Sequence, residues 1–190
     1  IIESISSEPS LHLVFKNKNV LEIFKEEHTK TSDLSAFIIN KKKIKDLENY
    51  KRGHWWVQDL SSMLPIYLSP EIKFKKVLDM CAAPGGKAFQ LISFKNDVKL
   101  NDISLKRTKK LKTNLDRLNF DNDIKNFNAL DLPEVEKFDV IILDSPCSGV
   151  GTLRRNPDIL FKKKPPDLDF LTKVQENLIN KAAKLLNING

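Results

Sequence analysis

One stretch near the middle of the chain, residues 77–87, constrains the fold more than any other. It opens with apolar residues that suit a buried strand and continues into a turn of small residues around Pro84, Gly85 and Gly86. Proline and glycine cannot continue the strand, and residues 88–92 are compatible with a helix. Small residues let the backbone approach a ligand closely, and the start of a helix presents unpaired N–H groups. The pattern predicts a doubly wound α/β fold with a nucleotide-sized site at the end of its first strand.

Strand-like and helix-like segments alternate along the rest of this region. An unbroken apolar run at residues 140–143 is typical of a central parallel strand covered on both faces. Alternation of this kind predicts a parallel sheet with right-handed crossovers. The expected strands are 75–80, 97–101, 124–128 and 138–144, and the expected helices between them are 86–94 and 105–118.

The first fifty residues carry a weaker pattern, which we interpret as a small α/β segment. It contains a candidate strand at 11–15, a short helix at 20–27 and a second strand at 36–39. Trp55 and Trp56 follow. We interpret the two tryptophans as packed core residues, with base stacking as the alternative.

Two further helices are expected outside this alternation. Apolar residues at helical spacing predict a helix at 60–68, which Pro65 should kink or shorten. The segment 145–166 is rich in glycine and proline and is interpreted as an ordered functional loop. Asp167 then begins a helix of about twenty residues with one apolar face.

The charge balance suggests a polyanionic partner, and RNA is one. The chain has 32 Lys and Arg residues against 25 Asp and Glu residues, a net charge of +7 and a pI near 9.3. Most individual lysines are better explained as solvated surface, so the clusters at 41–43, 106–112 and 162–164 carry more weight. No apolar run reaches membrane-spanning length and no signal peptide is visible, so we expect a cytoplasmic protein without membrane contact.

Two cysteines, Cys81 and Cys147, both lie inside motifs and do not make a disulfide framework. That usage suits a reducing compartment. A metal site needs more ligands than these two distant cysteines and three scattered histidines, so no metal is expected.

Three motifs, in this order along the chain, resemble the Sun/RsmB family of RNA cytosine-5 methyltransferases. They are the Trp-Val-Gln-Asp-Leu-Ser-Ser run at 56–62, the turn at 79–87 and the Asp-Ser-Pro-Cys-Ser-Gly run within 143–158. The family's turn is close to D-x-C-A-A-P-G-G-K-T, and Ala88 stands at its Thr position. Cys81 and Ala88 also exclude a phosphate-binding P-loop, which needs Gly and Ser or Thr there.

The resemblance, which runs from about residue 53 to the end, implies an α/β, Rossmann-like methyltransferase fold with a mostly parallel sheet. Residues 1–50 are expected to be the remnant of an N-terminal RNA-binding-type module, with a purely structural role as an equal alternative. Residues 51–190 are expected to be a partial S-adenosylmethionine-dependent methyltransferase domain. In the family the attacking cysteine lies in a later Thr-Cys-Ser segment, which would begin past Gly190. The sheet is therefore expected to be incomplete at the C-terminus.

The family's cofactor is S-adenosylmethionine, and the resemblance assigns several residues to it. Asp102 matches the acid that binds the ribose hydroxyls, with a capping role as the alternative. Asn128 stands where the family has an Asp on the adenine side, or Asp131 does if the alignment slips by three. Asp144 matches the motif acid near the methyl donor and target base. The loop itself is assigned to Cys81, Ala82, Ala83, Pro84, Gly85, Gly86 and Lys87.

The implied reaction is methyl transfer to C5 of a cytosine in RNA, specifically rRNA by analogy with the bacterial members; tRNA is the open alternative. Cytosine C5 is a weak nucleophile, and addition of a cysteine thiolate to C6 activates it. The resemblance gives Cys147, beside Asp144, the task of assisting release. Two alternatives stay open. In one, Cys147 itself attacks the cytosine; in the other, the chain is a non-catalytic fragment that binds S-adenosylmethionine or RNA.

Two arginines in the loop after this motif, Arg154 and Arg155, are candidate contacts for RNA phosphates. Ion pairing with Asp158, or simple exposure, explains them equally well.

Overall fold

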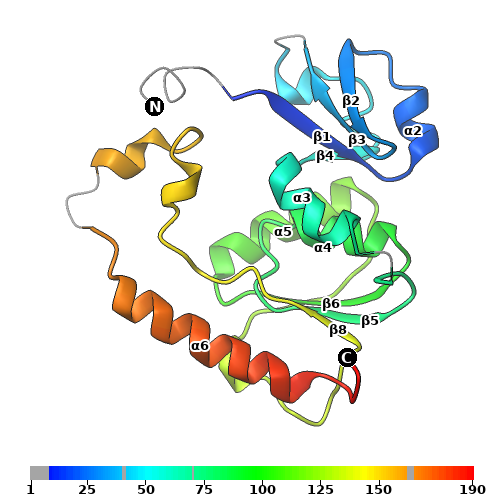
Figure 1. The fold of residues 1–190 in the computed structure, drawn as a ribbon. Coiled ribbons are helices and arrows are strands. Elements are labelled where there is room, and N and C mark those ends of the chain that lie inside the picture. Colours follow the sequence, from blue (N-terminus) through cyan, green and yellow to red (C-terminus); the bar gives the residue numbers. More distant parts are fainter. Residues whose placement is uncertain (1–8, 40–41, 70, 162–164) are drawn as a thin grey trace.

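The computed structural model describes residues 9–39, 42–69, 71–161 and 165–190, and Figure 1 shows them as two sheets, one above the other. Among these residues, no helix combines the length and the apolarity that crossing a membrane requires. The two sheets differ in type: the first is antiparallel and the second parallel.

The first sheet has the order β2-β3-β1-β4. Asn17 caps the short helix α2, since its side chain accepts a hydrogen bond from the N–H of Val20 at 3.1 Å. The cap starts this helix earlier than predicted, and it ends before residue 23. The elements are β1 (Leu11–Phe15), α2 (Lys18–Glu22), β2 (His28–Ser32), β3 (Ser35–Ile38) and β4 (Trp55–Val57).

The second sheet has the order β7-β6-β5-β8, and every pairing within it is parallel. The predicted α/β, Rossmann-like class is confirmed. Strands β7 and β8 are shorter than predicted. The elements are α3 (Leu60–Tyr67), β5 (Lys76–Asp79), α4 (Gly86–Ser93), β6 (Asp97–Asn101), α5 (Leu105–Arg117), β7 (Ile124–Lys125), β8 (Val140–Ile142) and α6 (Leu168–Leu185).

Helices cover both faces of the second sheet (Figure 1). One core cluster joins β5 and β6 to the buried faces of α3, α4 and α5, through residues such as Met63, Phe89 and Leu115. A second cluster packs Leu178 and Leu185 of α6 against the other face. As predicted, α6 starts at Asp167, whose side chain accepts the N–H of Phe170 at 2.9 Å.

A buried polar network joins the first sheet to α4, just behind the turn at residues 84–86. The Gln58 amide donates to Oε1 of Gln90 at 2.7 Å and accepts the indole N–H of Trp56 at 2.8 Å. Gln90 in turn donates to the carbonyl of Met63 at 3.2 Å. The division predicted at residue 50 stays a prediction, but β4, which pairs with β1, lies beyond it.

Arg117 holds the other side of this joint. Its guanidinium donates to the carbonyl oxygens of Tyr50 and Trp55 at 3.0 and 3.1 Å and lies over both rings. We expect Arg117→Ala to lower the free energy of unfolding by roughly 2–4 kcal/mol, because two half-buried carbonyls lose their partner. Urea denaturation measures this loss.

The matched control is Lys112→Ala on the exposed side of the same helix, where Lys112 pairs with Asp116. An exposed pair of this kind contributes little, so its stability should match that of the unsubstituted chain. Equal stability losses for both variants would contradict the role given to Arg117.

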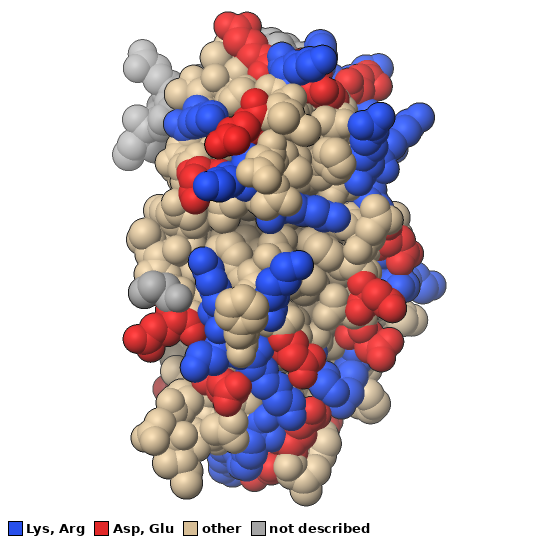
Figure 2. All heavy atoms as spheres, turned by 90° about the vertical axis from the view of Figure 1, so that its right-hand side faces the viewer, with Lys and Arg blue, Asp and Glu red and all other residues tan. Residues whose placement is uncertain are grey.

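Much of the surface charge is locally balanced. Figure 2 shows Lys and Arg side chains mixed with Asp and Glu side chains over one face of the molecule. Lys76 and Lys99, for example, lie 3.1 and 3.4 Å from the carboxylate of Glu136. The lysine cluster at 162–164, and Lys41 of the cluster at 41–43, lie outside the described residues. Any contact with RNA therefore has to be argued from particular residues.

Candidate active site

The turn between β5 and α4 depends on Gly85. This residue has φ +119°, and a Cβ there would lie 2.1 Å from the ring of Phe89 and 2.7 Å from Leu111. Gly86 then begins α4, and its missing side chain leaves room for Gln58, 3.2 Å from where a Cβ would be. The glycines thus give the turn a shape that other residues do not permit.

Asp102, at the end of β6, ties this turn to the neighbouring strand. Its side chain is 2% exposed and accepts the N–H of Ala83 at 3.1 Å and the N–H of Ser104 at 2.9 Å. Arg107 of α5 donates to the carbonyl of Ala83 from the other side. The cap of α5 itself is Ser104, whose side chain accepts the N–H of Arg107, so the capping role considered for Asp102 falls to its neighbour. Since a carboxylate accepts up to four hydrogen bonds, capacity remains for ribose hydroxyls.

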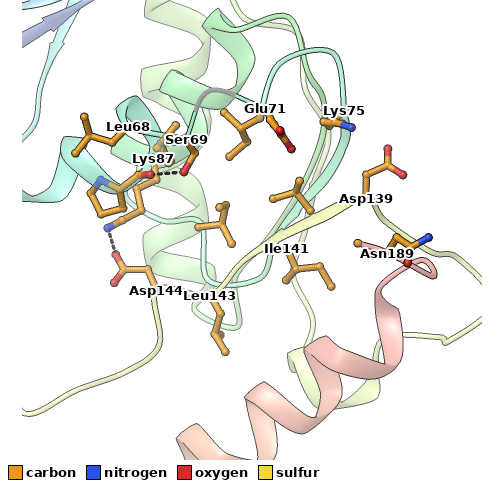
Figure 3. A pocket seen from close by; sticks show the side chains of 16 residues that line it. Leu68, Ser69, Glu71, Lys75, Lys87, Asp139, Ile141, Leu143, Asp144 and Asn189 are labelled. Atoms are coloured by element: carbon orange, nitrogen blue, oxygen red, sulfur yellow. Dashed lines mark hydrogen bonds and ion pairs between the residues drawn. The ribbon is translucent and has the colours of Figure 1, made fainter.

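Lys87 links the turn to the corner that follows β8. Its Nζ lies 2.7 Å from Oδ2 of Asp144 (Figure 3). The same Nζ lies 3.0 Å from Oγ of Ser62. Two motifs separated by more than fifty residues thus meet through one ion pair. Ser62 brings the third motif, at residues 56–62, to the same place.

A cavity of about 740 Å³ opens where these motifs converge. Its polar wall carries Cys81, Asp102, Asn128, Asp144 and Cys147, and its apolar wall comes from α6, through Phe170, Leu171, Val174 and Leu178. A smaller cavity of about 180 Å³ shares Cys81 and Asp144 with it and is lined by the rest of the turn except Gly85. Apart from Gly85, the predicted cofactor and catalytic residues therefore line one or both of these two adjoining cavities.

The two cysteines occupy different environments. Burial, together with the nearby carboxylates of Asp79 and Asp102, raises the pKa of Cys81 to about 11, so this thiol stays protonated. Cys147 is exposed on the loop after β8. The preceding carbonyl, of Pro146, accepts a hydrogen bond from the Gln175 amide on α6 at 2.8 Å. Cys81 is thus unsuited to act as a nucleophile, whereas the corner that carries Cys147 is held in place.

A family model described as 16S rRNA methyltransferase RsmB/F matches residues 65–190. The chain belongs to the RsmB/F family. Ribosomal RNA small subunit methyltransferase B from Photorhabdus laumondii is 34% identical over 149 residues, which cover 76% of this chain and 35% of that protein. The 28S rRNA (cytosine(4447)-C(5))-methyltransferase from Homo sapiens is 34% identical over 143 residues, 73% of this chain and 18% of that one. This RsmB/F chain thus spans about a third of the bacterial relative's length.

Solved structures agree on the fold. A methyltransferase homolog protein from Pyrococcus horikoshii superposes with a TM-score of 0.77 at 23% identity, covering 100% of this chain and 65% of that one. NSun6 from the same organism, solved with SFG, gives a TM-score of 0.66 at 25% identity, covering 81% and 42% of the two chains.

The RsmB/F cavity distinguishes between the two residues considered for the adenine side. Asn128 lines it, and its side chain accepts the N–H of Leu130 at 3.2 Å. Asp131 lies three residues on, at the exposed end of a short 3-10 turn, Ala129–Asp131. Of the two residues, Asn128 is thus the one that lies at the cavity, and its contact with adenine stays a prediction.

Asp79, at the end of β5, is a candidate that the sequence analysis did not single out. It lines the 180 Å³ cavity and is 1% exposed, and its Oδ1 has no hydrogen-bond partner among the described residues. Burial raises its pKa to about 7, although the N–H of Cys81 and the charge of Lys87 oppose the shift. A buried carboxylate without a full set of partners is costly, which points to a ligand that completes it. The sequence did contain a sign of this role, because Asp79 is the first residue of the turn motif at 79–87.

Arg154 and Arg155 border neither of these two cavities. Arg155 pairs with Asp59, at the start of α3, rather than with Asp158, among the residues that the structure describes. It also reaches the carbonyl of Ser10 at 3.5 Å. Both arginines line a separate cavity between the first sheet and the loop after β8.

A further cavity, of about 810 Å³, lies along the outer edge of β8 (Figure 3). Residues 139–144 form one wall, and the end of α3 with Leu68 and Ile72 forms another. In the described sheet β8 pairs on one side only, with β5. This hollow touches the turn only at Lys87, so we do not assign it to the cofactor.

Proposed function

We propose that this chain is part of an S-adenosylmethionine-dependent RNA (cytosine-5) methyltransferase that acts on rRNA in the cytoplasm. The observation that carries the proposal is the meeting of the turn, the Asp144 corner and residues 56–62 around one hollow through Lys87. The relatives support the substrate, because their names describe rRNA methyltransferases, one of them specific for cytosine C5. A neighbour solved with SFG, an analogue of S-adenosylmethionine, supports the cofactor.

The residues present fit this cofactor. S-adenosylmethionine supplies a methyl group on a cationic sulfur and also carries an ammonium group. The buried, incompletely paired carboxylate of Asp79 suits a cation, so we assign the methionine end to the 180 Å³ cavity. The adenosine then occupies the 740 Å³ cavity, with Asp102 accepting from the ribose and Asn128 facing the base. The turn at Gly85 and Gly86 lets the backbone approach without side chains in the way.

The target cytosine is placed beside Asp144, which lines both cavities. A carboxylate held by Lys87 can accept a hydrogen bond from the cytosine amino group and fix the orientation of the ring. A base has to leave any stack to reach this position. Cys147, held through Pro146 by Gln175, is assigned to the release step. The resemblance places the attacking cysteine in a segment that these 190 residues do not contain.

Calorimetric titration with S-adenosylmethionine tests the cofactor assignment. We expect one site per chain, and we expect Asp102→Asn to weaken binding at least tenfold, because an amide loses charge-assisted acceptance from the ribose. Asp131→Asn is the matched control, since Asp131 is exposed and should leave the affinity unchanged. Equal affinities for the two variants would contradict the ribose role.

Transfer of a labelled methyl group to 16S rRNA and to tRNA transcripts then tests the reaction. Labelled 5-methylcytosine in the rRNA supports the proposal, and label in tRNA alone would overturn its substrate. Binding of S-adenosylmethionine without transfer to either RNA would favour a non-catalytic fragment over a catalytic one.

A further inference from the structure

A cavity of about 390 Å³ lies between the first sheet and the loop after β8, and it is not one of the two cavities that we assign to the cofactor. The first sheet contributes Ser10 and Phe37, the start of α3 contributes Asp59 and Ser61, and the loop contributes Arg154 and Arg155. Its walls thus come from three segments distant in sequence.

This cavity continues the hollow that we assign to the methyl donor and the target base. Asp59 lines both the 390 Å³ cavity and the 180 Å³ cavity, on which Asp79, Lys87 and Asp144 also lie. The three cavities therefore follow one another along the molecule, with Asp144 shared at one junction and Asp59 at the next. The third cavity thus adjoins the one that Asp144 lines, next to the place assigned to the target base.

The side chains around it match a nucleotide in kind. The Phe37 ring is half-buried, and His12 packs against it edge-on with ring centroids 4.8 Å apart, which fixes its orientation. Arg155 is held by Asp59 and by the carbonyl of Ser10. A guanidinium has five N–H donors, so an arginine paired in this way keeps donors for a phosphate. An aromatic ring for a base and a fixed cation for the backbone are the two parts of a single-strand binding site.

We propose that this cavity holds the nucleotide next to the target cytosine in a single RNA strand, with its base on Phe37 and its phosphate near Arg155. The subsite rests on the proposed function, because it takes its position from the base placed beside Asp144. It also gives the first sheet a direct part in binding RNA, through one aromatic side chain.

Filter binding of labelled five-nucleotide RNAs with a single central cytosine tests the subsite. In two further RNAs, an abasic residue replaces the base on the 5′ or the 3′ side of the cytosine. We expect Phe37→Ala to weaken binding of the intact RNA roughly 5- to 150-fold, the range for one lost stacking contact. The unsubstituted chain should bind one of the two abasic RNAs more weakly than the intact RNA, by a similar factor. The Phe37→Ala variant should bind that abasic RNA and the intact RNA equally well, because the stacking contact is already lost.

Two further variants serve as controls. Phe37→Leu keeps the apolar packing without the aromatic face, and it should bind RNA as weakly as Phe37→Ala. The subsite can therefore still be tested if the alanine variant fails to fold. Phe74→Ala removes an aromatic side chain that is 78% exposed just before β5, at the opposite end of the strands, and should bind RNA normally.

Unchanged RNA binding by both Phe37 variants would overturn the subsite. It would also be overturned if both abasic RNAs lost the same affinity relative to the intact RNA, and lost it equally with the unsubstituted chain and with Phe37→Ala. The S-adenosylmethionine titration separates this failure from that of the proposed function. A chain that binds the cofactor but does not depend on Phe37 refutes the subsite alone, whereas a chain that binds neither cofactor nor RNA refutes both.

Discussion

Replacing Gly85 with alanine should abolish binding of S-adenosylmethionine and lower the free energy of unfolding by at least about 3 kcal/mol. The new Cβ would lie 2.1 Å from Phe89 and 2.7 Å from Leu111, both of which are buried in the main core cluster. The backbone also has φ +119°, which L-residues rarely adopt. Relief of the clash has to move either the core or the turn. Urea denaturation and calorimetric titration measure the two effects.

Gly151→Ala is the matched control. Gly151 lies in the loop after β8, and a Cβ there would meet no heavy atom within 4 Å among the described residues, its two chain neighbours aside. This variant should unfold at the same urea concentration as the unsubstituted chain and bind the cofactor with the same affinity. If Gly85→Ala behaves like Gly151→Ala, the turn does not have the tight packing described here.

The second large effect is expected from Asp79→Asn, and it depends on pH. Because the pKa of Asp79 rises from 3.8 to about 7 on folding, the folded chain binds more protons than the unfolded chain between these values. The contribution of Asp79 to stability therefore falls as the pH rises through this window and is constant above it. Asp79→Asn avoids that loss, so at pH 8 it should be more stable than the unsubstituted chain by on the order of 2–4 kcal/mol. At pH 4 the difference should be close to zero.

Unfolding in urea at a series of pH values measures this difference, with Asp131→Asn as the exposed control that should show none of it. The same substitution should weaken binding of S-adenosylmethionine strongly, since it removes the charge that we assign to its cationic end. If the Asp79 carboxylate serves to bind a ligand at a cost in stability, its replacement by Asn should make the chain more stable and weaken ligand binding. A variant that loses stability at pH 8 would contradict a buried, incompletely paired Asp79.

The elements of the second sheet were predictable where their periodicity was strong. Helices α4, α5 and α6 and strands β5 and β6 were placed within a few residues, because apolar spacing and turn residues mark them. Strand β2 was missed, since its sequence His-Thr-Lys-Thr-Ser has no apolar alternation and is placed by its pairing with β3. Strand β4 was missed because two adjacent tryptophans and a valine carry no alternation either.

The candidate site was predictable to the extent that it lies in contiguous motifs. The turn, Asp102, Asn128, Asp144 and Cys147 were all named from the sequence, and all of these except Gly85 border one of the two connected cavities. The contacts that set their positions were not predictable. Gln175 reaches Pro146 from another element, and Phe37 enters its cavity through strand register. Such partners follow from tertiary packing, which no local pattern encodes.

Both tryptophans of the chain lie at the joint between the first sheet and the rest of the molecule. Trp55 and Trp56 are 0% and 2% exposed, and the ring of Trp56 lies 5.7 Å from Phe89, which closes over the turn at Gly85. Intrinsic fluorescence therefore reports on this one joint, without a label. A red shift of the emission means that water has reached the contact between the first sheet and the turn at Gly85. Tryptophan emission thus measures whether the first sheet stays packed against the rest of the molecule.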